Sequence, residues 1–233
     1  MIGTFGLNLC ADTTLCLTQT LDFYIIDREH GRASLSEASH LLAAVSAECE
    51  RFVRVSTCER VEIQKVLELK PDGILVPQIS SLEEARNAVD WSYFPPKGSR
   101  GVSPYTRGFC FIHDDLERKK QRLNDELKLG LLIEGQSGFD ALDDIIENLG
   151  PQLHLLYFGL FDFANSKQVE ANWSNDEIFA ALQQMVAKAS KANIAIGTIA
   201  RSKAEISLLE HAGVQYIVYL NDLGIISEAV NDL

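Results

Sequence analysis

The feature of this sequence that most constrains its fold is the regular exchange of short apolar runs with longer segments of helical period. Eight such runs occur, at residues 2–7, 23–27, 52–55, 73–77, 130–134, 153–158, 195–198 and 216–220. Short buried strands separated by helices are typical of βα units around a parallel sheet. Eight runs fit a closed barrel better than an open sheet. We therefore predict an α/β protein, a (β/α)8 TIM barrel, with residues 1–233 forming a single domain.

Serines mark the starts of several predicted helices, since a hydroxyl at the N-cap accepts an unpaired amide hydrogen of the first turn. Ser34, Ser81 and Ser174 are the clearest, and Glu84 has the spacing to complete a capping box by reaching back to the Ser81 amide. The segment 93–110 contains too many helix and strand breakers for a regular element. We predict a long loop there, a feature that is often functional in a barrel.

The charge, the apolar content and the cysteines of the chain disfavour several classes of partner and location. The formal net charge of -12 disfavours nucleic-acid and membrane partners, because the average surface field repels phosphate groups. No apolar run approaches the roughly 20 residues of a membrane span. The five cysteines are widely spread, with no CxxC pair or zinc spacing, so we interpret them as free, partly buried thiols in a reducing compartment. We expect a soluble, cytoplasmic protein.

Two carboxylates follow neighbouring predicted strands at their carboxyl ends, where barrel enzymes carry their chemistry. Glu134 ends the fifth run, and Asp162 comes shortly after the sixth. Neighbouring strands lie about 4.8 Å apart, so both side chains could share one ion. Oxygen ligation of this kind suits Mg²⁺ or Mn²⁺. The alternative is two acids in solvated loops, and their pairing on one face favours the metal.

A histidine and an arginine also follow predicted strands. Asp27 and Glu29 fall on one side if the strand conformation continues, and a carboxylate there could orient His30 as a general base. The alternative is a surface histidine in a loop. Arg54 lies between two valines in an apolar strand and so needs a partner. An anion or developing enolate, and a structural salt bridge with a barrel carboxylate, stay equal alternatives.

Other enzyme classes lack their motifs. A Schiff-base mechanism needs a lysine in the barrel mouth, but Lys128 precedes the fifth strand and the other lysines fall in helices or loops. The sequence contains no GxGxxG, no P-loop and no nucleophile elbow. These observations favour a metal over an imine and give no support to dinucleotide, nucleotide or serine-hydrolase functions.

Several motifs, in their order and spacing, resemble the HpcH/HpaI family of class II pyruvate aldolases, relatives of the citrate lyase β subunit. The resemblance runs over nearly the whole chain, with Gly159 and Asp162 extending it. Its most specific pieces are Ile26-Asp27-Arg28-Glu29-His30-Gly31, Val53-Arg54-Val55, Gly73-Ile74-Leu75-Val76-Pro77, Phe94-Pro95-Pro96-Lys97-Gly98-Ser99-Arg100-Gly101-Val102 and Ile133-Glu134.

The resemblance implies a role for each of these side chains. Glu134 and Asp162 would hold a divalent metal, Mg²⁺ or Mn²⁺ with Co²⁺ as a further candidate, and pyruvate would chelate it through its carboxylate and keto oxygen. His30 would be the acid/base, acting through a water, with Asp27 in the same catalytic group. Arg54 would face the keto or enolate oxygen. The resemblance also implies a homo-oligomer of barrels, a trimer or a hexamer.

Three positions depart from the family pattern. Leu132 stands two residues before the metal glutamate, where these aldolases usually have a glutamine, so one polar contact to pyruvate is lost. Phe161 replaces a small residue before the metal aspartate and would crowd the substrate. Glu68 stands where the family has the aspartate that supports the catalytic histidine, and the resemblance implies that this longer carboxylate serves the same catalytic role. Leu132 and Phe161 would therefore line the substrate pocket together with Arg54 and Asp162.

Three hypotheses follow. The first is a carbon–carbon lyase, a metal-dependent class II aldolase that cleaves a 4-hydroxy-2-keto acid to pyruvate and an aldehyde, or runs the reverse condensation. The second is a lyase or decarboxylase acting on another keto acid or an acyl-CoA thioester, motivated by Leu132 and Phe161. The third is a catalytically impaired barrel with a binding role, motivated by the same two residues. Product analysis and metal titration separate them.

Overall fold

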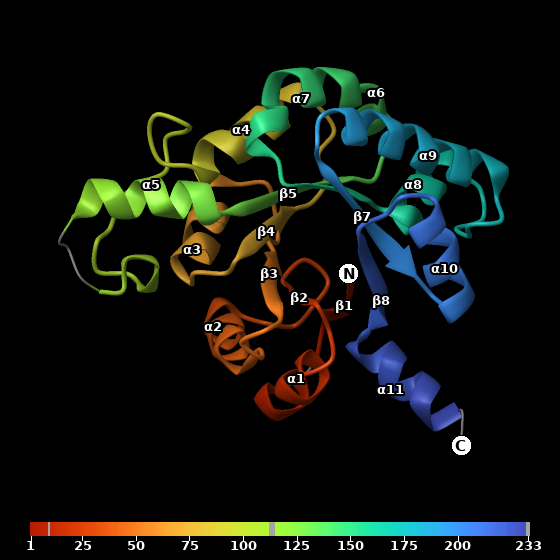
Figure 1. Ribbon diagram of the computed structural model, residues 1–233, viewed down its shortest axis with the longest axis horizontal. Coiled ribbons are helices and arrows are strands. Elements are labelled where there is room, and N and C mark those ends of the chain that lie inside the picture. Colours follow the sequence, from red (N-terminus) through yellow and green to blue (C-terminus); the bar gives the residue numbers. More distant parts are fainter. Residues whose placement is uncertain (9, 112–114, 232–233) are drawn as a thin grey trace.

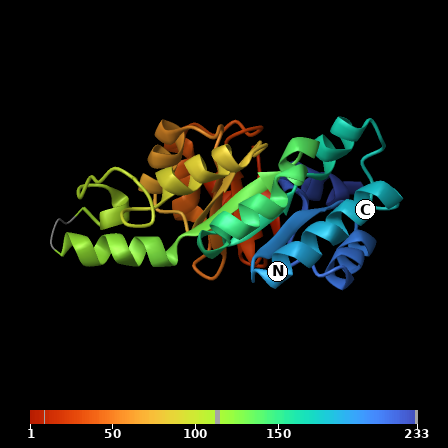
Figure 2. The ribbon, with the colours of Figure 1, turned by 90° about the horizontal axis from the view of Figure 1, so that it is seen from above.

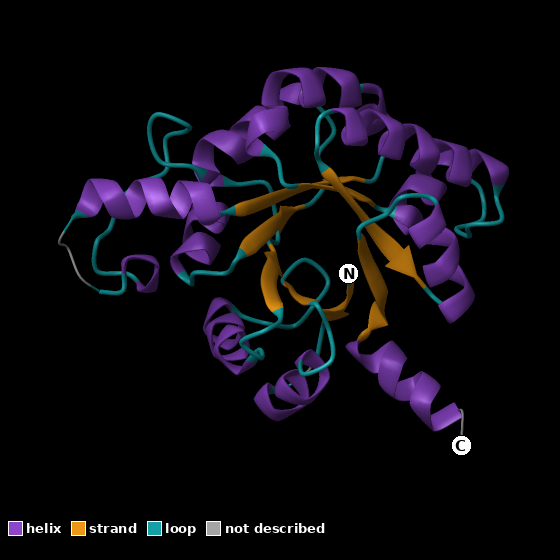
Figure 3. Ribbon diagram, viewed as in Figure 1, coloured by secondary structure: helices purple, strands orange, loops and turns teal. Residues whose placement is uncertain are grey.

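A closed parallel barrel forms the centre of the molecule in the computed structural model, which describes residues 1–8, 10–111 and 115–231. Over these residues the strands follow sequence order, and the last pairs with the first (Figure 1; Figure 3). The predicted (β/α)8 barrel is confirmed, and each strand begins and ends within about two residues of its predicted bounds. The strands are β1 (Ile2–Gly6), β2 (Phe23–Asp27), β3 (Glu50–Arg54), β4 (Gly73–Val76), β5 (Lys128–Ile133), β6 (Leu155–Phe158), β7 (Ala195–Ala200) and β8 (Tyr216–Asn221).

Helices surround this barrel on its outside, as the secondary-structure colouring of Figure 3 shows. Figure 2, turned by 90°, shows α5 extending to one side. The helices are α1 (Ala11–Thr18), α2 (Leu35–Ala44), α3 (Arg60–Glu68), α4 (Leu82–Ser92), η1 (Arg107–Phe109), α5 (Leu116–Glu126), α6 (Gln136–Asp140), α7 (Leu142–Leu149), η2 (Gly150–Gln152), α8 (Leu160–Lys167), α9 (Asp176–Lys191), α10 (Lys203–His211) and α11 (Asp222–Asn231). Part of the predicted 93–110 loop forms the short helix η1, and the rest is irregular.

The predicted helix caps are confirmed in part. Ser34 caps α2, and Glu37 completes the capping box by accepting from the Ser34 amide at 2.8 Å. Ser81 caps α4 by accepting from the Glu84 amide at 3.2 Å. The predicted reach of the Glu84 side chain back to Ser81 is wrong, because this carboxylate accepts from the amide and the hydroxyl of Ser80.

The predicted cap at Ser174 is also wrong. The N-cap of α9 is Asn175, whose side-chain oxygen accepts from the amides of Glu177 and Ile178. The Ser174 hydroxyl donates instead to the Asn172 side chain at 2.7 Å. The asparagine lies one residue closer to the helix, so its amide oxygen takes the role that we assigned to the hydroxyl.

Two apolar cores hold the fold together. The larger one lies between the strands and the outer helices. The smaller one fills the barrel interior, where edge-on ring contacts such as Phe23 against Tyr216, at 5.1 Å between centroids, leave little space. Its members are Phe5, Phe23, Ile25, Phe52, Leu75, Leu132, Leu155, Tyr157, Tyr216 and Val218. Filling of this kind makes the barrel a packed core, so chemistry is confined to its ends.

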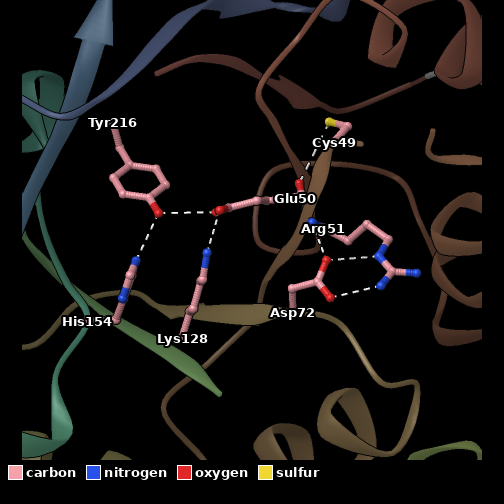
Figure 4. A network of polar contacts seen from close by, with 7 residues as sticks. All are labelled: Cys49, Glu50, Arg51, Asp72, Lys128, His154 and Tyr216. Atoms are coloured by element: carbon pink, nitrogen blue, oxygen red, sulfur yellow. Dashed lines mark hydrogen bonds and ion pairs between the residues drawn. The ribbon is translucent and has the colours of Figure 1, made fainter. Parts of the chain in front are cut away.

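A polar network closes the amino end of the barrel (Figure 4). The Tyr216 hydroxyl donates to Glu50 at 3.1 Å and lies 2.8 Å from Nε2 of His154. Lys128 forms an ion pair with the same glutamate. Lys128 therefore lies at the end of the barrel opposite to the predicted active site.

All five cysteines are free, as predicted, although Cys10, Cys16 and Cys110 are exposed rather than partly buried. Burial raises the pKa of Cys49 to about 12, so this thiol stays protonated. Within the described part of the chain, no helix has the length and apolar character needed to cross a membrane.

Candidate active site

Arg54 is the fixed cation of the barrel mouth. It is the last residue of β3 and pairs in register with Asp27, the last residue of β2. Its Nε lies 2.9 Å from Asp27 Oδ1, and a terminal nitrogen lies 2.5 Å from Asp27 Oδ2. Glu29 forms a further ion pair with it at 3.1 Å. Of the two alternatives for Arg54, the structure therefore contains the salt bridge with barrel carboxylates.

The same guanidinium also stacks on an aromatic ring. Its central carbon lies 4.6 Å from the centroid of the Phe5 ring, and only 10% of the side chain is exposed. Two carboxylates and a ring thus fix the orientation of Arg54. A cation held in this way needs no reorganisation when negative charge develops beside it.

Glu134 follows β5 and is held by Gln78, which follows β4. The backbone amide of Gln78 donates to Glu134 Oε1 at 2.6 Å, and the side-chain amide of Gln78 donates to Glu29 at 2.8 Å. Gln78 adopts a left-handed backbone, with φ of 59°. A Cβ at Gly159 would lie 2.4 Å from the Glu134 Cβ, so only glycine fits against this side chain.

Glu134 and Asp162 lie close enough to interact electrostatically. The pKa of Glu134 is raised to about 7, mainly by burial and in smaller part by the charges of Glu29 and Asp162. Asp162 lies in the first turn of α8 and is exposed. A partly buried carboxylate beside two others is a donor set that a divalent cation would stabilise, so these residues fit the expected metal.

The protein alone would supply only part of the coordination shell. Within residues 1–8, 10–111 and 115–231, no three His, Cys, Asp or Glu side chains form a group that could hold a metal ion. A cation at Glu134 and Asp162 would therefore take its remaining ligands from water and substrate, which is the usual arrangement where a metal binds a reacting molecule.

The raised pKa of Glu134 gives a prediction for the metal-free protein. The carboxyl is protonated below about 7 in the folded chain, but only below about 4.5, its ordinary value, when unfolded. The folded state thus binds more protons between these values, so the free energy of unfolding should fall as pH rises from 4.5 to 7. Urea denaturation in EDTA measures this slope. Glu134→Gln should lose part of it, and an identical slope in the variant would contradict the assignment.

His30 lies at the mouth, but its ring is not oriented as we predicted. The side chain is exposed, and its ring has no hydrogen-bond partner among the described residues. Asp27 accepts from the backbone amide of His30 at 3.2 Å, while Asp27 and Glu29 direct their side chains to Arg54. The prediction that these carboxylates orient the imidazole is therefore wrong, because the guanidinium competes for them.

Glu68 lies far from His30 within one subunit. It is the last residue of α3, and this helix runs antiparallel to β3, so it ends near the amino end of the barrel. There it interacts electrostatically with Arg100. His30 follows the carboxyl end of β2, at the opposite end. The expectation that Glu68 supports His30 is thus not met inside the subunit.

The two residues expected to reshape the pocket lie in different surroundings. Leu132 is buried in the barrel interior, as expected for a side chain two residues before Glu134. Phe161 is 48% exposed in the first turn of α8, so nearly half of its side chain faces solvent. The structure brings Arg54, Asp27, Glu134, Asp162, His30 and Leu132 to the same end of the barrel, and places Phe161 on the adjacent turn of α8.

Sequence reasoning missed two residues of this region. Gln78 could have been found from its position, since it is a polar residue directly after a predicted strand. Tyr157 could not have been found from the sequence. It lies within an apolar run, where a tyrosine is normally interpreted as a core residue.

These features define a class: a (β/α)8-barrel enzyme whose mouth joins a fixed arginine, a pair of carboxylates and a histidine. A model of the HpcH/HpaI aldolase/citrate lyase family matches residues 10–218. The chain belongs to this family, and it is an aldolase-family carbon–carbon lyase.

Characterised relatives and solved structures agree with this membership. A hydroxypyruvate/pyruvate aldolase of Sagittula stellata is 28% identical over 98% of this chain and 89% of that protein. A 5-keto-4-deoxy-D-glucarate aldolase of Klebsiella pneumoniae is 27% identical over 91% of this chain and 82% of that protein. The crystal structure of a family member from Burkholderia cenocepacia superposes with a TM-score of 0.88 at 23% identity, covering 98% of this chain and 92% of that one.

Proposed function

We propose that this protein is a metal-dependent class II aldolase that cleaves a 4-hydroxy-2-keto acid to pyruvate and an aldehyde, and that catalyses the reverse condensation. The observation that carries the proposal is the locked Arg54, held by Asp27, Glu29 and Phe5 at the mouth that also contains Glu134. Two of its relatives are aldolases of hydroxypyruvate/pyruvate and of a keto-deoxy sugar acid.

Each side chain has a task in this reaction. A divalent cation bound by Glu134 and Asp162 would act as a Lewis acid that lowers the energy of negative charge on the keto acid. Arg54 presents its guanidinium to the oxygen that gains charge, without having to move. His30, exposed at the mouth, takes the proton of the 4-hydroxyl group through a water as the carbon–carbon bond breaks.

The test is an assay of the purified protein with pyruvate and a panel of aldehydes, in the presence of Mg²⁺, Mn²⁺ or Co²⁺. We expect aldol products that form with at least one of these metals and disappear with EDTA. The reverse reaction should release pyruvate from the same products. Absence of any metal-dependent product across the panel would contradict the proposal.

A second candidate is a decarboxylase or lyase on another keto acid or an acyl-CoA thioester. It is favoured by Leu132, which presents an apolar side chain where a pyruvate contact was expected. Oxaloacetate and thioester substrates, with analysis of the products, separate this candidate from the first. Turnover of these compounds without any aldol product would favour it.

We also propose that the protein forms a homo-oligomer, a trimer or hexamer. Helix α11 leaves the barrel in Figure 1 and carries three exposed apolar residues on one side: Leu223, Ile226 and Val230. Such a face is stabilised when a second subunit covers it. Light scattering should give three or six times 25.9 kDa, and Ile226→Asp should lower the measured mass. A monomeric wild type would contradict this.

A further inference from the structure

Tyr157 carries a buried hydroxyl that nothing in the described chain explains. Its side chain belongs to the barrel interior and is 4% exposed, yet its hydroxyl has no hydrogen-bond partner within the described residues. A buried polar group without a partner is destabilising, and native proteins contain few of them. The Tyr157 hydroxyl is therefore available to donate to a bound molecule.

The Tyr157 ring lies near the mouth of the barrel, because it packs edge-on against the Phe5 ring on which Arg54 stacks. Tyr216, another tyrosine of the interior, directs its hydroxyl to the opposite end, where Glu50 and His154 bind it (Figure 4). The charges that act on the Tyr157 hydroxyl are those of Arg54, Glu134 and Asp27, all residues of the mouth, with Arg54 the strongest. Burial raises the pKa of Tyr157, so the group stays protonated and can donate a hydrogen bond.

Tyr157 also lies beside the position that lost a polar group. It pairs in register with Leu132, the residue that stands where a pyruvate-binding glutamine was expected. Leucine cannot donate or accept a hydrogen bond. The Tyr157 hydroxyl on β6, one strand away, is therefore a donor that can replace the one missing from β5. The Phe5 ring, on which Arg54 stacks, packs edge-on against the Tyr157 ring at 5.9 Å between centroids.

We propose that the Tyr157 hydroxyl is a catalytic hydrogen-bond donor to the keto oxygen of the substrate, in place of the glutamine absent at position 132. This inference rests on the proposed aldolase function. The donor would act on the same oxygen as Arg54, the charge that influences it most. Because that oxygen gains negative charge as the bond breaks, the hydrogen bond is stronger in the transition state than in the bound substrate.

The experiment compares Tyr157→Phe, Leu132→Gln and the double variant in the metal-dependent cleavage assay. Tyr157→Phe should lower kcat about 100-fold and change KM less than about threefold. The double variant should recover about tenfold of this loss, because it restores a donor on β5. Tyr157→Phe should melt at or above the temperature of the wild type, since it removes an unpaired buried hydroxyl.

Tyr216→Phe is the matched control. It removes a tyrosine hydroxyl from the same interior, but at the amino end, so it should lower the melting temperature and leave kcat unchanged. An unchanged kcat in Tyr157→Phe, with an active wild type, would overturn the inference and leave the proposed function intact.

A binding measurement separates the inference from the proposed reaction. Oxalate has the planar shape and charge of the enolate of pyruvate, and calorimetry with Mn²⁺ measures its affinity. We expect Tyr157→Phe to bind oxalate about tenfold more weakly than the wild type. Weakened binding in an enzyme without aldolase turnover would support the donor and contradict the reaction. Equal binding by both proteins would overturn the donor.

Discussion

Replacing Glu134 by glutamine should lower kcat/KM for metal-dependent cleavage about a thousandfold. Glutamine keeps the shape of the side chain and can still accept from the Gln78 amide, but it removes the negative charge that a divalent cation needs. Loss of that cation removes about 4 kcal/mol of transition-state stabilisation. Steady-state kinetics over a range of Mn²⁺ concentrations measures the effect.

Glu170→Gln is the control for this change, because it removes the same charge from an exposed position in the loop between α8 and α9. It should leave the kinetics unchanged. Calorimetric titration should show weaker Mn²⁺ binding in Glu134→Gln and in Asp162→Asn, but not in Glu170→Gln. If Glu134→Gln kept the activity of the wild type, the metal assignment would be wrong.

The second large effect concerns stability. Asp27→Asn should lower the free energy of unfolding by about 3–5 kcal/mol, because it removes the main counter-charge of a buried arginine. Only 1% of the Asp27 side chain and 10% of the Arg54 side chain are exposed, so water cannot replace the lost partner. Urea denaturation at pH 7 measures the change. Activity should fall as well, since Arg54 loses its orientation.

The comparison is with Asp125→Asn, which breaks the exposed ion pair between Lys97 and Asp125. Exposed pairs contribute little, so this variant should lose less than about 1 kcal/mol. Similar losses in the two variants would mean that the Asp27 and Arg54 pair has no special role. The Asp27→Asn protein should keep its metal affinity, because within the described residues no hydrogen bond or ion pair joins Asp27 to Glu134 or to Asp162.

The barrel could be predicted from the sequence because its strands are buried on both faces and therefore appear as apolar runs. The position of Glu134 followed from the same logic, since a polar residue that ends such a run lies at the mouth. The partners of Arg54 could not be predicted from the sequence, because a neighbouring carboxylate such as Asp27 and a bound anion are equally suitable partners of a guanidinium. The register between β2 and β3 determines the partner, because it places Asp27 directly beside Arg54.

Other parts of the site depend on three-dimensional detail. Gln78 reaches Glu134 only because its backbone is left-handed, and a lone glutamine gives no signal of that. The expected contact between Glu68 and His30 was drawn from family resemblance. The direction of α3, however, already places the end of that helix opposite to the mouth. Ser174 was preferred over Asn175 although both residues are good caps.

The cluster of Glu50, Lys128, His154 and Tyr216 offers an opportunity for engineering (Figure 4). Apolar side chains of the barrel interior, among them Phe5 and Leu132, lie between it and the mouth with Arg54 and Glu134, and the amino face of such barrels serves thermal robustness rather than turnover. Libraries restricted to these four positions should thus yield heat-resistant or heat-sensitive versions with unaltered substrate preference. Selection for new aldehydes belongs on the opposite rim.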